Sequence, residues 1–318
     1  FFGVWAMFRT FYKNFPKASD GIALGVFYIP SIWFWGSGLL KDSVTFSFLG
    51  VVTYCIYHLI IQFKLRQPYL IALLIFCGVS IYNIKPYIII SFVPFAVLWV
   101  GLTYRTQITN PLFRTAFTPF LLIFSAVFSV LALGRVAEGS GRYSLENVLE
   151  TAVLVQQDLT SSYYYEDGIG STYNIGTFDA SLTSTLRVLP QAIFVTFFRP
   201  FLFEARNPLM LLAAIESTFM LLLFLRVLRQ TRVFGLFKYL LAHPMLLFSI
   251  SYALAFSFMV GLTSGNFGNL VRYKIPCIPF FVVPLLIANQ FSQAYLRPED
   301  ADENLTTEQM RRKMAVVS

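Results

Sequence analysis

The sequence predicts an all-α membrane protein, a polytopic helical bundle of about 8–9 transmembrane helices with one long extracytoplasmic loop that carries interfacial helices. The first observation is composition, because 57% of the 318 residues are hydrophobic and only 13% are charged. Soluble globular proteins contain roughly a quarter charged residues. The second observation is that apolar stretches of spanning length recur along the whole chain. These features exclude a soluble globular domain.

The predicted spans are apolar windows of about 17–25 residues, the length of helix that crosses a bilayer. They cover residues 21–38, 42–62, 68–84, 86–103, 115–134, 208–226, 240–262 and 273–291, and another apolar stretch ends at Phe8. We expect one more span and its outer loop upstream of Phe1. The chain then divides into an N-terminal transmembrane bundle (1–134), an extracytoplasmic loop (135–207), a C-terminal transmembrane bundle (208–291) and a cytoplasmic tail (292–318).

Lysine and arginine in the short connections set the predicted orientation, because short loops rich in these residues stay in the cytoplasm. Alternate connections contain Arg9, Lys13, Lys17, Lys64, Arg66, Arg105, Arg114, Arg226, Arg229, Arg232 and Lys238. These connections are therefore predicted to be cytoplasmic. The turns that contain Lys41, Lys85 and Arg272 are predicted to face the other side, together with the long loop.

Two helices are predicted within the long loop. Residues 144–158 have apolar side chains at the spacing of an amphipathic helix. The later stretch TLRVLPQAIFVTFFRP is apolar for about eleven residues, which is too short to span a bilayer. It is typical of an interfacial helix that lies on the outer leaflet with its aromatic side chains among the lipid headgroups.

Polar residues at the predicted outer surface form the candidate site. The stretch IPSIWFWGSGLLKDSVTF places Lys41 and Asp42 after a Gly-Ser-Gly hinge, between two apolar runs. Charges there are costly unless they lie at a surface and have a role. The candidate substrate-binding residues are Lys41, Lys85, Arg187, Arg199, Arg206, Arg272, Lys274 and Trp35, and the candidate catalytic residues are Asp42, as an assisting acid, and Glu204.

This set of residues suits a phosphorylated lipid. Arginine and lysine hold phosphate, aromatic rings stack on sugars or rest at the headgroup level, and a carboxylate acts as a base or orients an acceptor hydroxyl. The alternative is that the same residues are interface anchors and snorkelling cations, which polytopic proteins commonly have. Glu216 is the only acid well inside a predicted span, where either a functional role or a bond to a neighbouring helix would account for it.

Other site classes find little support in the sequence. Cys55, Cys77 and Cys277 lie in apolar runs without paired spacing, so neither a disulfide framework nor a metal site is predicted. No cofactor is evident, and a divalent metal, although possible, is unsupported. The net charge of +8 is scattered between hydrophobic spans rather than gathered on one polar face, which argues against nucleic acid as a partner.

Several stretches carry a resemblance to a known family. Pro30 with FWGSGLLKDS, the long outer loop, FRPFLFEARNP and the final NLVRYKIPCIPF are together similar to bacterial polytopic glycosyltransferases of the GT-C type. These enzymes take sugars from polyprenyl-phosphate donors. The resemblance implies an integral protein of the bacterial inner (plasma) membrane that works in polysaccharide biosynthesis of the cell envelope, with a lipid-linked sugar donor and membrane lipids as partners.

The resemblance also implies residue roles. Asp42 matches an assisting acid in the second outer turn, Arg272 matches a basic residue that meets the donor phosphate, and the principal catalytic acid is expected upstream of Phe1. Two other functions stay open. The chain is then either a non-catalytic membrane subunit of a larger complex, or a transporter or flippase of lipid-linked glycans, although the predicted spans contain few polar residues.

Overall fold

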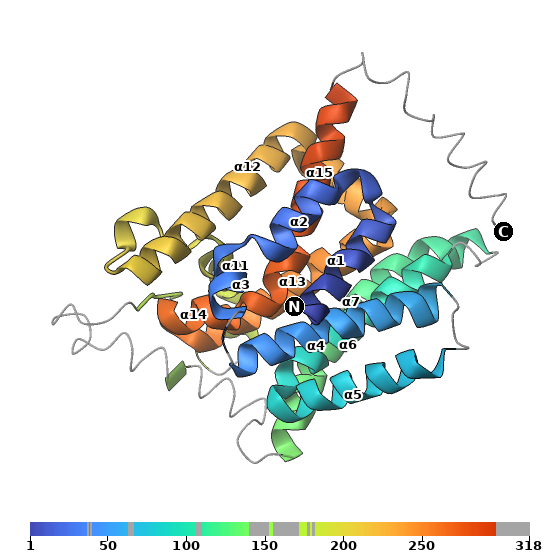
Figure 1. The fold of residues 1–318 in the computed structure, drawn as a ribbon, viewed down its shortest axis with the longest axis horizontal. Coiled ribbons are helices and arrows are strands. Elements are labelled where there is room, and N and C mark those ends of the chain that lie inside the picture. The colour runs from blue at the N-terminus through green and yellow to red at the C-terminus, as the bar shows by residue number, and fades with distance from the viewer. Residues whose placement is uncertain are drawn as a thin grey trace.

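The described part of the protein is a bundle of helices, which confirms the all-α prediction. The computed structural model describes residues 1–36, 38, 40–62, 67–105, 110–139, 153–154, 172–176, 179 and 182–296. Within these ranges the structure contains helices and one isolated β-bridge between Thr172 and Asn266, and no β-strand. Figure 1 shows the helices packed around one another, with the N-terminus beside the central helices.

The N-terminal half is built from short and long helices that follow one another closely. They are α1 (Phe2–Asn14), η1 (Pro16–Ala18), α2 (Ser19–Phe27), α3 (Pro30–Gly36), α4 (Lys41–Ile56), the π-helical turn η2 (Tyr57–Ile61), α5 (Pro68–Ile84), α6 (Pro86–Tyr104) and α7 (Pro111–Gly139). Helix α4 packs on α1 and α5, and α6 packs on α7.

The C-terminal half adds the long helices that complete the bundle. Its elements are α10 (Leu182–Arg187), α11 (Leu189–Phe198), η4 (Leu202–Glu204), α12 (Pro208–Ala242), α13 (Pro244–Ser264), α14 (Phe267–Tyr273), η5 (Ile275–Cys277) and α15 (Ile278–Leu296). Helix α13 packs on α6, α11 and α15, while α15 packs on α2 and α12. Segments from both ends of the sequence therefore share one core.

Four described helices are long and apolar enough to cross a membrane. These are α4 with η2, α6, α12 and α13, and α14 with α15 makes a fifth if this pair, bent by 40°, counts as one span. Length and composition thus support an integral membrane protein with four or five spanning helices. The larger number of about 8–9 spans stays a prediction.

Proline explains where many helices begin. It occupies the first position of α3, α5, α6, α7, α12 and α13, where its missing N–H would have no partner within the helix in any case. The predicted span over 21–38, which contains Pro30, is therefore broken into two helices. Pro30 cannot donate to the preceding turn and its ring would clash with it, so the chain forms α2 and α3 with a break at Tyr28 and Ile29.

The last predicted spans also differ in extent from the observed helices. Helix α12 continues past residue 226 to Ala242, with a break at Arg232, where φ is 56° and ψ is 165°. Residues 273–291 form no single helix, because η5 separates α14 from α15. Helix α15 extends to Leu296, and the rest of the predicted tail lies outside the described residues.

Two glycine contacts bring helices unusually close. A Cβ atom on Gly50 of α4 would lie 2.1 Å from the carbonyl oxygen of Gly3 in α1. A Cβ atom on Gly261 of α13 would lie 2.3 Å from the carbonyl oxygen of Ala192 in α11. Neither position has room for a side chain, so glycine is what allows these backbones to touch.

The second predicted loop helix exists, and one of its faces is buried in the protein. Helix α11 covers the apolar run, and Ala192, Val195 and Phe197 are all fully buried. The Phe197 ring stacks on Phe281 of α15 with 3.9 Å between ring centroids. Phe197 and Phe198 therefore pack in the protein core, where Gly261 lets α13 approach, whereas Phe194 is exposed. The predicted helix at 144–158 lies outside the described residues except for 153–154.

Candidate functional site

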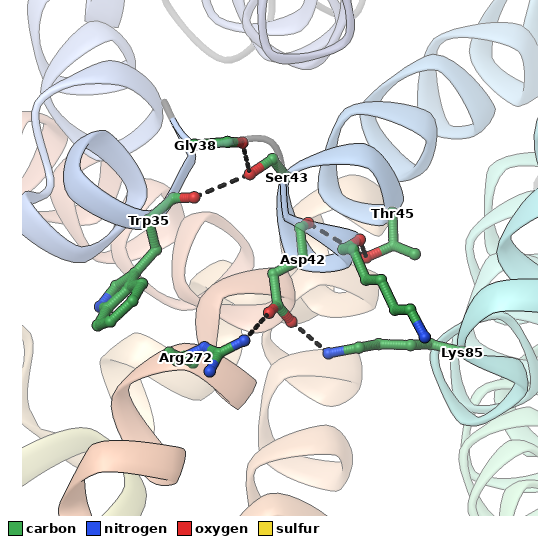
Figure 2. A network of polar contacts seen from close by, with 8 residues as sticks. Trp35, Gly38, Asp42, Ser43, Thr45, Lys85 and Arg272 are labelled. Atoms are coloured by element: carbon green, nitrogen blue, oxygen red, sulfur yellow. Dashed lines mark hydrogen bonds and ion pairs between the residues drawn. The ribbon is translucent and has the colours of Figure 1, made fainter.

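The α3–α4 turn fixes the position of Asp42. The Ser43 hydroxyl donates to the carbonyl oxygens of Trp35 at 2.8 Å and Gly38 at 2.6 Å, so the end of α3 is tied to the start of α4. Asp42 is the second residue of α4, where a negative charge suits the helix dipole. Only 3% of its side chain is exposed. The turn therefore directs the carboxylate into the protein, as Figure 2 shows.

Asp42 joins two cations that lie far apart in the sequence. Its Oδ1 atom forms an ion pair with Nζ of Lys85, the residue between α5 and α6, and its Oδ2 accepts from Arg272 of α14 at 3.0 Å. Figure 2 shows both cations converging on the carboxylate. Lys85 also lies 4.9 Å from the ring centroid of Tyr273. The cluster contains one negative and two positive charges, so its net charge is positive.

Arg272 is the member of this cluster that reaches solvent. About a third of its side chain is exposed, at 35%, whereas Asp42 and Lys85 are largely covered. Its guanidinium lies over the Trp35 ring at 5.2 Å from the ring centroid. Within the described residues its buried Nε has no hydrogen-bond partner. Arg272 is therefore held by an acid and an aromatic ring while part of its donor set stays available to a ligand.

A second charged cluster follows α11. Arg199 and Glu204 form a two-bond ion pair, with Arg199 Nε 3.2 Å from Glu204 Oε2, and Glu204 Oε2 also accepts from the backbone N–H of Phe201 at 2.7 Å. The Arg199 guanidinium lies 5.2 Å from the ring centroid of Phe267 in α14. Glu204 thus closes a turn and orients Arg199 against the helix that carries Arg272.

A cavity of about 320 Å³ lies between α3, α12 and α14. Trp35, Phe267 and Arg272 belong to its wall, and so do Ser31 and Glu216. Arg272 is partly exposed and Glu216 is buried, so the lining runs from the surface cluster into the protein. The other lining side chains are mostly apolar. An apolar pocket with a few convergent polar groups is the usual form of a small-molecule site.

Glu216 and Lys274 form a fully buried ion pair at this cavity. Glu216 Oε1 lies 3.4 Å from Nζ of Lys274, and neither side chain is exposed. Glu216 Oε2 accepts from the Ser31 N–H at 2.7 Å. Lys274 Nζ also donates to the Ser217 hydroxyl at 3.5 Å, which itself donates to the Arg199 carbonyl oxygen at 2.9 Å. The pair therefore links the cavity to the second cluster.

The structure divides the predicted site residues into two clusters, one buried lysine and three exposed cations. Asp42, Lys85, Arg272 and Trp35 come together in one cluster, and Arg199 and Glu204 come together in another. Lys274 does not lie at the outer rim where the sequence placed it, because its charge is buried against Glu216. The remaining predicted residues are exposed: Lys41 at the start of α4, Arg187 at the end of α10 and Arg206 between η4 and α12.

The arrangement limits what the two predicted catalytic acids can do. Each Asp42 oxygen is already held by a cation, and both Glu204 oxygens are held by Arg199. A carboxylate so engaged orients the cations that it holds. Asp42 therefore fixes the position of Arg272 in the cavity wall. The sequence did not indicate that Ser31 lines the cavity, whereas Glu216 was recognisable as an acid within a predicted span.

The described residues contain no group of three or more His, Cys, Asp or Glu side chains placed to hold a metal ion. Arginine, lysine, aromatic and carboxylate side chains make up the described site. Comparison of this chain with models of protein families, with curated proteins and with solved structures finds no match.

Proposed function

We propose that the chain is an integral membrane glycosyltransferase, which moves a sugar from a polyprenyl-phosphate-linked donor to an acceptor at the extracytoplasmic face of the bacterial inner membrane. The observation that carries the proposal is the placement of Arg272. It is fixed by Asp42 and Trp35, partly exposed, and part of the wall of a cavity. A positioned guanidinium beside a cavity suits a ligand that joins a phosphate to a neutral group.

Arg272 would bind the donor phosphate and stabilise it as it departs. The acceptor hydroxyl attacks the anomeric carbon, the bond from that carbon to the phosphate oxygen breaks, and polyprenyl phosphate leaves with the electron pair. Its added negative charge is met by Arg272 and by Lys85 behind it. The acceptor proton passes to a carboxylate that acts as general base, for which the family resemblance implies a residue other than Asp42, and Asp42 assists by holding the two cations.

The proposal includes about 8–9 spans. Helix α5 has 17 residues and is about 25 Å long at about 1.5 Å per residue, and α7 has 29 residues. Both present large apolar side chains at their surfaces, including Ile75 and Phe76 of α5 and Phe120 and Ile123 of α7, as lipid-facing helices do. Adding α5, α7 and the broken span formed by α2 and α3 to the five candidate spans gives eight spans among the described residues.

The proposed orientation has support from the two ends of the bundle. Asp42, Lys85 and Arg272, from turns predicted to lie outside, meet in one cluster. Lys17, from a connection predicted to be cytoplasmic, accepts a hydrogen bond at its carbonyl oxygen from Gln290 near the other end of α15. The contacts between predicted outer residues and the contact of the predicted cytoplasmic residue Lys17 therefore lie at opposite ends of the bundle.

The test measures sugar transfer by the full chain reconstituted in liposomes with a radiolabelled polyprenyl-phosphate hexose. Arg272→Ala is expected to lower kcat/KM by about 10- to 150-fold, the range for losing a hydrogen bond to a charged group of roughly 1.5–3 kcal/mol. Arg229→Ala, which removes an exposed arginine from the predicted cytoplasmic part of α12, is the matched control and is expected to keep wild-type activity. Equal activity of Arg272→Ala and wild type would refute the assignment.

A second candidate function is a non-catalytic subunit that binds the same lipid. The observation in its favour is that the oxygens of Asp42 and Glu204 are already engaged in ion pairs, so neither carboxylate is free to contact an acceptor hydroxyl. This candidate predicts binding of the polyprenyl-phosphate sugar that depends on Arg272, without transfer to any acceptor by the chain alone. Turnover by the purified chain would exclude it.

A further inference from the structure

The cavity beside Arg272 contains two buried polar atoms that lack hydrogen bonds. Ser31 Oγ and Glu216 Oε1 have no hydrogen-bond partner among the described residues, although Ser31 is only 3% exposed and Glu216 only 1%. Both residues line the cavity. A buried polar atom without a partner is unfavourable, and native proteins rarely keep one without a reason. These atoms therefore indicate a ligand that would complete their hydrogen bonds.

The charges at the cavity define what such a ligand must be. Glu216 disfavours an anion near Oε1, and Lys274, 3.4 Å from that oxygen, disfavours a cation. Glu216 Oε1 can only accept a hydrogen bond, while the Ser31 hydroxyl can donate and accept. The ligand that fits both atoms is a neutral group with several hydroxyls.

The size and the aromatic lining narrow the choice to a sugar ring. At about 320 Å³ the cavity lies near the lower end of the range of roughly 300–1,000 Å³ for ligand pockets, so it suits one ring better than a longer glycan. Trp35, Phe34 and Phe267 line it, and aromatic rings provide apolar faces for a sugar to pack against. Arg272 lines the same cavity, so a phosphate bound there would direct its attached sugar toward Glu216.

We propose that this cavity is the binding site for the sugar ring of the lipid-linked donor, with one sugar hydroxyl donating to Glu216 Oε1 and another exchanging a hydrogen bond with Ser31 Oγ. Lys274 is a positioning residue, because it faces the same carboxylate oxygen from inside the protein. The inference rests on the proposed function, since it places the sugar by way of the phosphate on Arg272. It adds a sugar site distinct from the phosphate site.

The experiment compares two ligands for the full chain in lipid nanodiscs. One is a short-chain prenyl phosphate, and the other is the same lipid bearing glucose, mannose, galactose or N-acetylglucosamine. Wild type is expected to bind at least one sugar-bearing lipid about ten-fold more tightly than the bare phosphate. Ser31→Ala should reduce this preference by about three- to ten-fold, as for a neutral hydrogen bond, and should leave affinity for the bare phosphate unchanged.

Glu216→Gln should reduce the preference by ten-fold or more, because a hydrogen bond to a charged acceptor is stronger. Since this change leaves Lys274 buried without its acid, the double variant Glu216→Gln/Lys274→Met provides a second test in which both charges are absent. Equal binding of bare and sugar-bearing lipids by wild type, or a preference that survives in both Ser31→Ala and the double variant, would overturn the inference.

The outcomes separate this inference from the proposed function. If wild type binds neither lipid, or if Arg272→Ala leaves affinity for the bare phosphate unchanged, the phosphate site and the proposed function fail. If the bare phosphate binds through Arg272 but no sugar adds affinity, the phosphate site stands and the sugar site is wrong.

Discussion

Replacing Lys274 by methionine should destabilise the folded protein severely. Lys274 and Glu216 are both fully buried and lie 3.4 Å apart. Without the lysine, the Glu216 carboxylate keeps only the Ser31 N–H as a hydrogen-bond donor among the described residues. Removing one partner of a buried ion pair typically costs about 3–5 kcal/mol, because the remaining charge is left uncompensated. We expect a loss of unfolding free energy in this range.

The same reasoning predicts recovery when both charges are removed. The double variant Lys274→Met/Glu216→Gln contains no buried charge, and its glutamine side-chain oxygen can still accept from Ser31. Replacing a buried pair by uncharged residues of similar volume is often neutral or stabilising. The double variant should therefore regain most of the stability that Lys274→Met alone loses.

The assay is reversible unfolding in mixed micelles at increasing denaturant, read by far-UV circular dichroism, for wild type, both single variants and the double variant. Lys238→Met, which removes an exposed lysine from α12, is the control and should change stability by less than about 0.5 kcal/mol. A cost below about 1 kcal/mol for Lys274→Met, or a double variant no more stable than Lys274→Met, would show that the pair is not coupled as the geometry requires.

Three further predictions concern helix packing, the charge cluster around Asp42 and a histidine. Gly50→Ala should lower the thermal unfolding midpoint, because the new Cβ would lie 2.1 Å from a carbonyl oxygen of α1, whereas Gly78→Ala, with nothing within 4 Å, should leave it unchanged or raise it. Asp42→Asn should lower the free energy of unfolding by about 2 kcal/mol, since it leaves two cations facing each other. This loss should be smaller in high salt, because one of the two cations is partly exposed. A loss that does not depend on salt would contradict the prediction. Burial lowers the pKa of His243 below its ordinary 6.5, so as pH falls through 6.5 the unfolded chain takes up a proton before the folded chain does and stability falls; His243→Gln should remove this slope between pH 7.5 and 5.5.

Composition and apolar periodicity were enough to predict the fold class, because burial in lipid demands long apolar helices. The predicted windows 68–84 and 86–103 agree closely with α5 and α6, where proline and the end of the apolar run mark the same boundary. The window 21–38 contains two helices because Pro30 lies inside it, and proline at that position favours a new helix start.

Part of the site could not be predicted from the sequence. Asp42 and Arg272 are 230 residues apart, and no local pattern states that α4 and α14 meet at one end of the bundle. Both residues were chosen for their residue type and their predicted side of the membrane. Neither criterion predicts which residues they contact. Ser31 carried no signal, because a serine within an apolar run is common and only the packing of α3 against α12 places it at the cavity.

The burial of Lys274, by contrast, could have been inferred. Arg272 and Lys274 are two residues apart, and on a helix with 3.6 residues per turn this separation places them about 200° apart, on opposite faces. The two side chains cannot face the same surface if the backbone continues as a helix, and it does so from α14 into η5. One of the two cations had to point inward, where it required an acid. Glu216, the only acid well inside a predicted span, was the partner available, so helical geometry and charge balance together already favoured this pair.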